Sequence, residues 1–202
     1  MARYTGPASR VCRRLGECIC NKKKCTIGKR AFPPGQHGQN RIKMTDYGIQ
    51  LREKQKVKKM YGLVEKQFRV TFDKASRAKG VTGEKLLELL ERRLDNVVFR
   101  LGFASTRRQA RQWVGHGHVK VNGRKVGVPS YAVRVNDVVE IKDNTVSRQM
   151  ATKNLEISTS RAVPDWLLLN KEAFKGTVLR IPSRDEIQPI ANEQAVVEFY
   201  SR

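Results

Sequence analysis

Acidic residues are scarce in this chain. Its 202 residues include 19 Asp and Glu against 41 Lys and Arg, which gives a formal net charge of +22 at pH 7. A cytosolic enzyme of this size rarely carries such an excess, because like charges repel one another unless a polyanion neutralises them. Nucleic acid is therefore the leading candidate partner, and an anionic membrane surface is the alternative.

The excess of basic residues is uneven along the chain. Residues 1–60 hold 16 basic and 3 acidic residues, residues 61–160 hold 19 and 10, and residues 161–202 hold 6 and 6. We therefore expect the polyanion to contact the first two of these segments. The neutral last segment is typical of ordinary folded protein or of a surface that faces a protein neighbour.

Long hydrophobic runs and catalytic motifs are also missing. No apolar run approaches the roughly 20 residues of a membrane-spanning helix, and the first residues lack the apolar segment of a secretory signal. The sequence has no dinucleotide-binding, phosphate-loop, metalloprotease or serine-hydrolase motif. His116 and His118 have no carboxylate near them in sequence. We expect a cytoplasmic protein that is not an enzyme and has no membrane contact and no small-molecule substrate.

Cysteines occur only in one short segment, as Cys12-x5-Cys18-x-Cys20-x4-Cys25. In a reducing compartment such a cluster favours a metal over disulfides. Four thiolates can enclose a tetrahedral zinc ion, and a 4Fe–4S cluster also takes four cysteines. Unligated thiols, with no cofactor, are the remaining alternative. Nearby arginines and lysines are predicted to promote ionisation of the thiols, and a bound metal would have the structural role of folding a polar segment.

Helical periodicity begins after residue 43. Thr45 and Asp46 are predicted to open a basic helix that ends near Tyr61 and Gly62. A second helix is expected over residues 64–80, and a third, strongly apolar on one face, over residues 82–102. We interpret residues 1–43 as an extended basic arm with a local knot at the four cysteines.

The middle of the chain predicts a short helix followed by small hairpins. Thr106 and Gln109 fit a capping box. At about 100° per residue, the residues Ala110, Trp113 and Val114 share one arc of this helix. The neighbouring arc holds Arg107, Arg108 and Arg111. Asn122-Gly123 predicts a tight turn, and a second hairpin is expected around Asn136-Asp137.

The basic arc is predicted to bind RNA phosphates. No acidic residue lies between Asp95 and Asp137, so the sequence shows no counter-charge within that interval. Cations on rigid elements suit phosphate contact, and nothing resembles a DNA-reading helix followed by dimer heptads. The predicted RNA-binding residues are Arg107, Arg108, Arg111, Lys120, Arg124 and Lys125, then Arg52, Lys56 and Lys59 on the first long helix, and Arg13, Arg14, Lys22, Lys23 and Lys24 in the arm.

Several long stretches, in order, resemble the family of the fourth protein of the bacterial small ribosomal subunit. They are MARYTGP, PPGQHG, LREKQKVKKMYG, EKQFR, RLDNVVFRLGFASTRRQARQWVGHGHVKVNGRKV and NEQAVVEFYSR. The resemblance implies an α+β fold: a mainly helical domain (44–93 and 160–202), an inserted RNA-binding module of two helices and a small twisted antiparallel sheet (94–159), and the extended arm (1–43).

The resemblance also implies a function. The family binds small-subunit ribosomal RNA directly at a helix junction in the 5′ domain and nucleates subunit assembly. It contacts neighbouring small-subunit proteins, above all the fifth, which affects translational accuracy, and it lies near the path of messenger RNA. An RNA-modifying enzyme with the same module, and a zinc-finger-like DNA binder, are the rival interpretations.

The cysteine segment departs from the family pattern. Members with a metal-binding arm commonly begin with a C-x-x-C pair, and Ser9 stands at the first of those positions. Cys12, Cys20 and Cys25 fit the remaining positions, and Cys18 is additional. The resemblance therefore implies three ligands, and Cys18 is the candidate that could replace the missing fourth.

Overall fold

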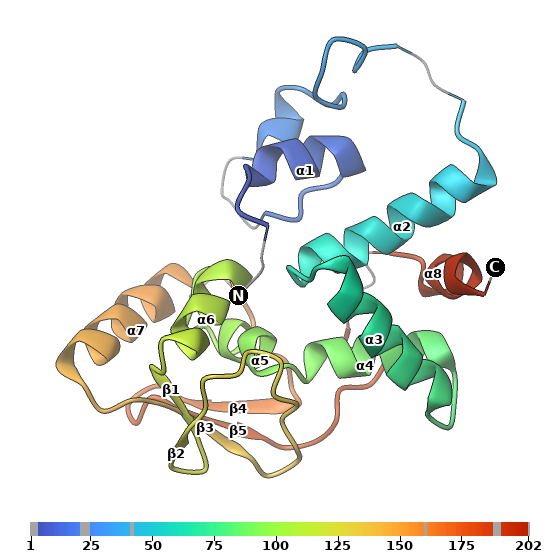
Figure 1. Ribbon diagram of the computed structural model, residues 1–202. Helices are drawn as coiled ribbons and strands as arrows, with labels where there is room; N and C mark the ends of the chain where they lie inside the picture. Colours follow the sequence, from blue (N-terminus) through green and yellow to red (C-terminus); the bar gives the residue numbers. More distant parts are fainter. Residues whose placement is uncertain (1–3, 21–24, 41–42, 160, 188–190, 202) are drawn as a thin grey trace. The chain divides into compact units, whose positions relative to one another are not determined.

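The computed structural model describes residues 4–20, 25–40, 43–159, 161–187 and 191–201. They form two compact units (Figure 1). The first comprises Met1–Leu86 and Pro189–Arg202, and the second comprises Leu87–Gln188. Among the described residues, no helix has the length and apolar character needed to cross a membrane.

The first unit is helical. Its elements are α1 (Ala8–Leu15), the short 3₁₀ helix η1 (Thr26–Gly28), α2 (Asp46–Met60), α3 (Glu65–Arg77), the first half of α4 (Thr82–Glu91) and α8 (Glu193–Tyr200). The Thr45 hydroxyl accepts a hydrogen bond from the Gly48 amide and caps α2, as predicted. Gly62 follows α2 with φ +68°, a conformation that favours glycine. The arm is not wholly extended, because α1 buries Cys12 and Leu15.

A carboxylate on α3 joins α2 to the C-terminal helix α8 within this unit. Glu65 accepts hydrogen bonds from Lys54 Nζ of α2 at 2.8 Å, from Lys58 Nζ at 2.5 Å and from the Tyr200 hydroxyl of α8 at 2.8 Å. Lys54 Nζ also lies 4.6 Å from the centroid of the Phe199 ring. These contacts hold the C-terminal helix against α2 and α3.

Acid should weaken this junction. Burial alone would raise the pKa of Glu65, but hydrogen bonds from Lys54, Lys58 and Tyr200 lower it to about 2 from an ordinary 4.5. Because the folded-state pKa is depressed, the stabilisation is complete above pH 4.5 and is lost as the pH falls towards 2. The Glu65 side chain is 47% exposed, so solvent screening should limit the effect to about 1 kcal/mol or less.

Hydrogen exchange of α2 and α8 amides, corrected for intrinsic rates, measures this effect. We expect Glu65→Gln to remove the loss of protection between pH 4.5 and pH 2, and Glu84→Gln, at an exposed position on α4, to retain it. An identical pH profile in the wild type and Glu65→Gln would contradict the assignment.

The second unit packs helices against a five-stranded antiparallel sheet. Its helices are the end of α4, α5 (Leu94–Arg100), α6 (Arg107–Gly115) and α7 (Thr145–Ile157), and its strands are β1 (Val119–Val121), β2 (Arg124–Lys125), β3 (Val138–Ile141), β4 (Leu167–Asn170) and β5 (Lys175–Val178). The strand order is β2-β1-β3-β5-β4. Asn122 and Gly123 both have positive φ in the β1–β2 turn, as a type I′ turn requires.

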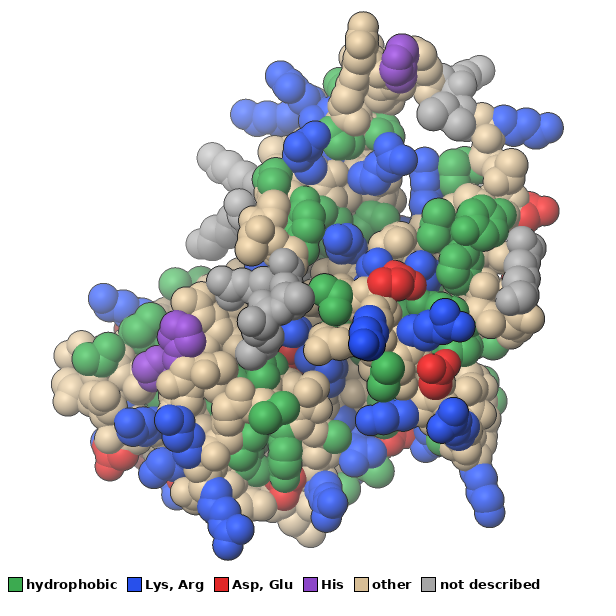
Figure 2. All heavy atoms as spheres, viewed as in Figure 1, with side chains coloured by type: hydrophobic (Ala, Val, Ile, Leu, Met, Phe, Trp, Pro, Cys, Tyr) green, Lys and Arg blue, Asp and Glu red, His purple; other side chains and the backbone are tan. Residues whose placement is uncertain are grey.

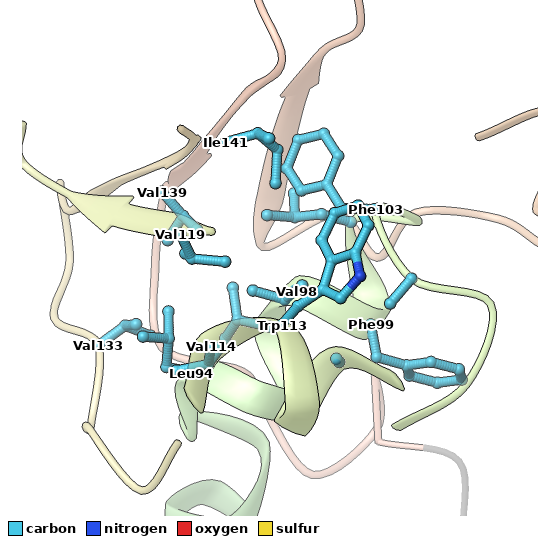
Figure 3. Packing of buried hydrophobic residues seen from close by; sticks show 14 of the residues in the cluster. Leu94, Val98, Phe99, Phe103, Trp113, Val114, Val119, Val133, Val139 and Ile141 are labelled. Carbon is cyan, nitrogen blue, oxygen red and sulfur yellow. The ribbon is translucent and has the colours of Figure 1, made fainter. Parts of the chain in front are cut away.

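The core of this unit lies between the helices and the sheet. Val119, Val139 and Ile141 of the sheet face Val98, Trp113 and Val114 of α5 and α6 (Figure 3). A Cβ added to Gly176 of β5 would overlap the Leu101 side chain, so the sheet approaches the end of α5 too closely for a side chain there. The core thus fixes α6 and the β1–β2 hairpin in one rigid body.

Three features differ from the sequence predictions. The hairpin expected around Asn136-Asp137 does not form, because residues 126–137, all of which the structure describes, contain no strand and β3 pairs instead with β1 and β5. The helix expected over 82–102 is two helices, because Arg93 has extended φ and ψ angles and bridges to Ala132. Residues after 159 were assigned to the helical domain, but β5 pairs with β3 and β4 pairs with β5. Residues 161–187 therefore belong to the sheet-containing unit, whose α+β fold agrees with the predicted class.

Candidate nucleic-acid interface and cysteine cluster

Five of the predicted RNA-binding cations reach the surface of the second unit. Arg108 on α6 and both residues of β2, Arg124 and Lys125, are exposed, and Arg107 and Lys120 are half-buried. In Figure 2, Lys and Arg side chains far outnumber Asp and Glu on the visible face. Because α6 and the hairpin share one core, the backbone positions that carry these cations are fixed relative to one another.

Arg111 does not belong to this exposed set, contrary to the prediction. Its side chain is 7% exposed, and its Nη1 lies 3.6 Å from Asp95 Oδ2. Asp95 also accepts two hydrogen bonds from Arg93, at 3.1 and 2.9 Å. The counter-charge comes from α5, which packs against α6. The lack of acidic residues between Asp95 and Asp137 in the sequence therefore did not leave Arg111 without an acidic neighbour in the fold.

Arg107 is held by neighbours on α5. Its Nε donates to Asn96 Oδ1 at 2.8 Å. Asn96 in turn donates from Nδ2 to Glu91 Oε2 at 2.6 Å, and Arg100 forms two hydrogen bonds with the Glu91 carboxylate, at 3.0 and 2.7 Å. The side chain of Glu91 is fully buried. This polar network joins the end of α4 to α5 and α6 and limits the positions that Arg107 can take.

The two histidines lie close to each other at and just after the end of α6. His118 Nδ1 lies 3.0 Å from Ser147 Oγ, and the His116 and His118 ring centroids are 6.2 Å apart. Burial lowers the pKa of His118, and the nearby His116, Lys142 and Lys125 lower it further. His118 therefore favours its neutral form more strongly than an ordinary histidine does.

In the first unit, some predicted cations are engaged by the protein itself. Lys56 Nζ pairs with Glu17 at 2.6 Å and Glu53 at 2.8 Å, and its side chain is only 12% exposed. Arg13 donates to the carbonyls of Phe32 and Pro33, at 3.0 and 3.3 Å. Both residues thus organise the arm rather than present a free charge.

The other predicted first-unit cations differ in exposure. Arg14 is exposed and Arg52 is half-buried, and Lys59 Nζ lies 4.1 Å from the centroid of the Tyr4 ring. The predicted residues Lys22, Lys23 and Lys24 lie outside the described residues.

The four cysteines converge. Their Sγ atoms all lie within 4.8 Å of one another. Cys18 and Cys20 are 3.7 Å apart at sulfur, and so are Cys20 and Cys25. A tetrahedral zinc with bonds of about 2.3 Å separates its sulfur ligands by about 3.8 Å, so the observed spacing fits such a centre. The Cys18-x-Cys20 spacing therefore does not prevent both thiols from joining one site.

The thiols do not all ionise readily, contrary to the sequence prediction. Burial raises the pKa of Cys12 to about 11. Partial desolvation and hydrogen bonds with Cys25 and Cys20 raise the pKa of the exposed Cys18 to about 12. The backbone amide of Ile27, together with hydrogen bonds from neighbouring thiols, lowers the pKa of Cys25 to about 7. Crowding and desolvation therefore outweigh the nearby cations at Cys12 and Cys18.

Comparison with known proteins gives the family. The Ribosomal protein S4/S9 N-terminal domain matches residues 3–91, and the S4 domain matches residues 92–139. Small ribosomal subunit protein uS4A of Symbiobacterium thermophilum is 55% identical over 208 aligned residues, which cover 100% of both chains. The uS4 proteins of Thermoanaerobacter sp. (strain X514) and Geobacter sp. (strain M21) are each 52% identical with the same coverage.

These findings confirm the resemblance seen in the sequence. The relatives carry the name of a ribosomal protein and not of an enzyme, in agreement with the expected non-catalytic role. The matched S4 domain contains α5, α6 and the β1–β2 hairpin, the elements that carry the exposed cations. This chain belongs to the uS4 family of small ribosomal subunit proteins.

Proposed function

We propose that this protein binds small-subunit ribosomal RNA directly, through phosphate contacts made by its second unit. The observation that carries the proposal is the exposure of Arg108, Arg124 and Lys125 on elements fixed by one core. Each guanidinium or ammonium group displaces condensed counterions from a phosphate, and this release drives binding. Lys120 and Arg107 extend this surface within the second unit, and Arg52, Arg14 and Lys59 of the first unit are separate candidates for phosphate contact. Arg111 and Lys56 serve the fold.

The mechanism is positional. Cations held at fixed separations bind best when RNA helices meet in one arrangement, so binding stabilises that arrangement over others. This supports a role at a helix junction of the 5′ domain and in nucleating assembly of the subunit, in the cytoplasm where ribosomes work. By the family resemblance, the protein also contacts the fifth small-subunit protein, influences translational accuracy and lies near messenger RNA.

A footprint of the full chain on small-subunit ribosomal RNA tests the proposal. We expect protection of backbone positions clustered at one junction in the 5′ domain, at one protein per RNA. Protection scattered over the RNA, or confined to another domain, would contradict it. Duplex DNA as competitor distinguishes an RNA binder from the rival DNA-binding interpretation.

We further propose that the four cysteines hold one structural zinc ion. When bound, the metal supplies the positive charge that makes four adjacent thiolates compatible and closes the segment between α1 and η1. A 4Fe–4S cluster uses the same four sulfurs, and elemental analysis with visible absorbance separates the two. We expect zinc and no absorbance from iron–sulfur charge transfer.

Substituting the additional cysteine tests the ligand set. We expect Cys18→Ser to reduce zinc retention during dialysis by at least about tenfold, since the set loses a thiolate that a hydroxyl replaces poorly. Ser9→Ala, at the position where relatives of the metal-binding type have their first cysteine, is the control and should retain one zinc per chain. Equal zinc contents in the two variants would exclude Cys18 from the site.

A further inference from the structure

The Phe99 ring lies at the edge of the core and is covered by cations. It is 2% exposed, yet it points away from the rings of Trp113 and Phe103 (Figure 3). The guanidinium carbon of Arg107 lies 4.4 Å from the ring centroid, and that of Arg161 lies 4.1 Å away. Two guanidinium groups therefore exclude water from this ring where an apolar side chain would ordinarily do so.

Arg161 is fixed by backbone carbonyls. Its Nη1 donates to the Phe99 carbonyl and its Nη2 to the Ser105 carbonyl, each at 3.3 Å. Within the part of the chain that the structure describes, no Asp or Glu forms an ion pair with Arg161. Neutral carbonyl dipoles and an aromatic face hold the group in place and leave its formal charge uncancelled.

The surroundings of Arg161 are positive. Burial lowers the pKa of Arg161, and the charge of Arg100 lowers it further. Arg100 is itself paired with Glu91. A half-buried cation among other cations is costly unless an anion completes the group.

We propose that Arg107 and Arg161, both stacked on Phe99, form a binding site for a phosphodiester group of RNA. A guanidinium whose face lies on an aromatic ring keeps donors at its edge, and this edge fits two oxygens of a phosphate. Stacking also removes most of the rotamer freedom that each side chain would otherwise lose on binding. That the phosphate belongs to RNA rests on the proposed function. That the site binds a phosphate group does not depend on it.

This site extends the RNA-binding surface beyond the S4 domain. That domain ends at residue 139. Arg161 belongs to residues 161–202, whose balanced charge predicted ordinary folded protein or a surface facing a protein neighbour. The chain between α7 and β4 returns past α5 and places the guanidinium group of Arg161 over the same Phe99 ring as that of Arg107. No local pattern of charge could have revealed it.

Titration of the full chain with inorganic phosphate tests the site itself. We expect the side-chain Nε–H resonance of Arg161 to shift saturably with phosphate and not with equal chloride, and the shift to disappear in Phe99→Leu. Arg180 is paired with Glu186, and its resonance serves as the internal control. An Arg161 resonance that moves no more than that of Arg180 would overturn the site, whatever the RNA results.

Binding to a 5′-domain transcript then tests the source of the phosphate. We expect Arg161→Ala to weaken binding about tenfold and to lower the slope of log K against log salt by about 0.9. Lys171→Ala, which removes an exposed cation of the same unit, should change neither. A double-mutant cycle of Arg161→Ala with Phe99→Leu should show strong coupling, since both remove the same stacked donor.

The failures are distinguishable. If the wild type does not bind the transcript but Arg161 still responds to phosphate, the proposed function falls and the phosphate site stands. If the wild type binds and folded Arg161→Ala keeps its affinity and salt slope, RNA is not the ligand of this site. Tryptophan fluorescence confirms folding, because Trp113 and Trp166 both lie in the core of this unit.

Discussion

Replacing Asp95 with alanine should lower the free energy of unfolding of the second unit by roughly 3–5 kcal/mol. The Asp95 carboxylate is 6% exposed, receives two hydrogen bonds from Arg93 and lies 3.6 Å from Arg111. Its removal takes a negative charge away from two buried guanidinium groups that cannot regain water without disrupting the core. The cost arises mainly from these groups rather than from the net strength of the pair.

Urea unfolding followed by tryptophan fluorescence measures this prediction, since both tryptophans report on the second unit. The matched control is Asp143→Ala. Asp143 pairs with Arg148, but the two side chains are 75% and 51% exposed, so the expected cost is about 0–1 kcal/mol. Similar destabilisation by the two substitutions would show that burial of the Asp95 group does not set its contribution.

Removing the exposed cations should have the largest effect on RNA binding. We expect Arg108→Ala, Arg124→Ala and Lys125→Ala together to weaken binding to a 5′-domain transcript by more than about tenfold. The slope of log K against log salt should fall by about 2.7, or roughly 0.9 for each phosphate that is no longer neutralised. The fluorescence unfolding curve should hardly change, because these side chains lie at the surface.

A second triple variant separates position from total charge. Arg148→Ala, Lys153→Ala and Lys171→Ala remove the same charge from exposed positions on α7 and near β4. We expect this variant to keep most of the affinity and the wild-type salt slope. Equal reductions in affinity in the two triple variants would mean that RNA responds to net charge alone.

The sequence predicted those elements whose signals are local. Thr45 and Thr106 cap α2 and α6, and the Asn122-Gly123 turn joins β1 and β2. The capping box at α6 is altered, since Gln109 Oε1 accepts from the Ser105 amide at 2.8 Å rather than from Thr106. In each case a few adjacent residues determine the backbone conformation, so the local sequence is sufficient to predict it.

Helix α7 shows why other elements were missed. Its buried residues are Ser147, Ala151 and Asn154, which are small or polar, while Val146, Met150 and Ile157 are exposed. The apolar periodicity that reveals a helix is therefore reversed on α7. Strands β4 and β5 were not predicted as strands. The pairing of β5 with β3, and of β4 with β5, depends on long-range contacts that no local pattern states.

The candidate site divides in the same way. Helical spacing correctly placed Ala110, Trp113 and Val114 in the core, but it placed Arg111 beside the exposed arginines. The side chain of Arg111 is turned inward by its contact with Asp95 of α5. The side chain of Arg161 is held by its contact with the Phe99 ring. Both contacts come from other parts of the chain. The convergence of the four cysteines was predictable because they lie within one short segment, whereas their protonation was not, since it depends on burial.

The most direct test of RNA binding is the affinity of the wild-type chain for the 5′ domain of small-subunit ribosomal RNA between about 50 and 200 mM salt. We predict a linear fall of log K with log salt, of about 0.9 per phosphate bound, with at least Arg108, Arg124 and Lys125 each binding one. We also predict stronger binding to this transcript than to another domain of the same RNA. Affinity that is independent of salt, or equal for the two transcripts, would contradict phosphate recognition by a fixed set of cations.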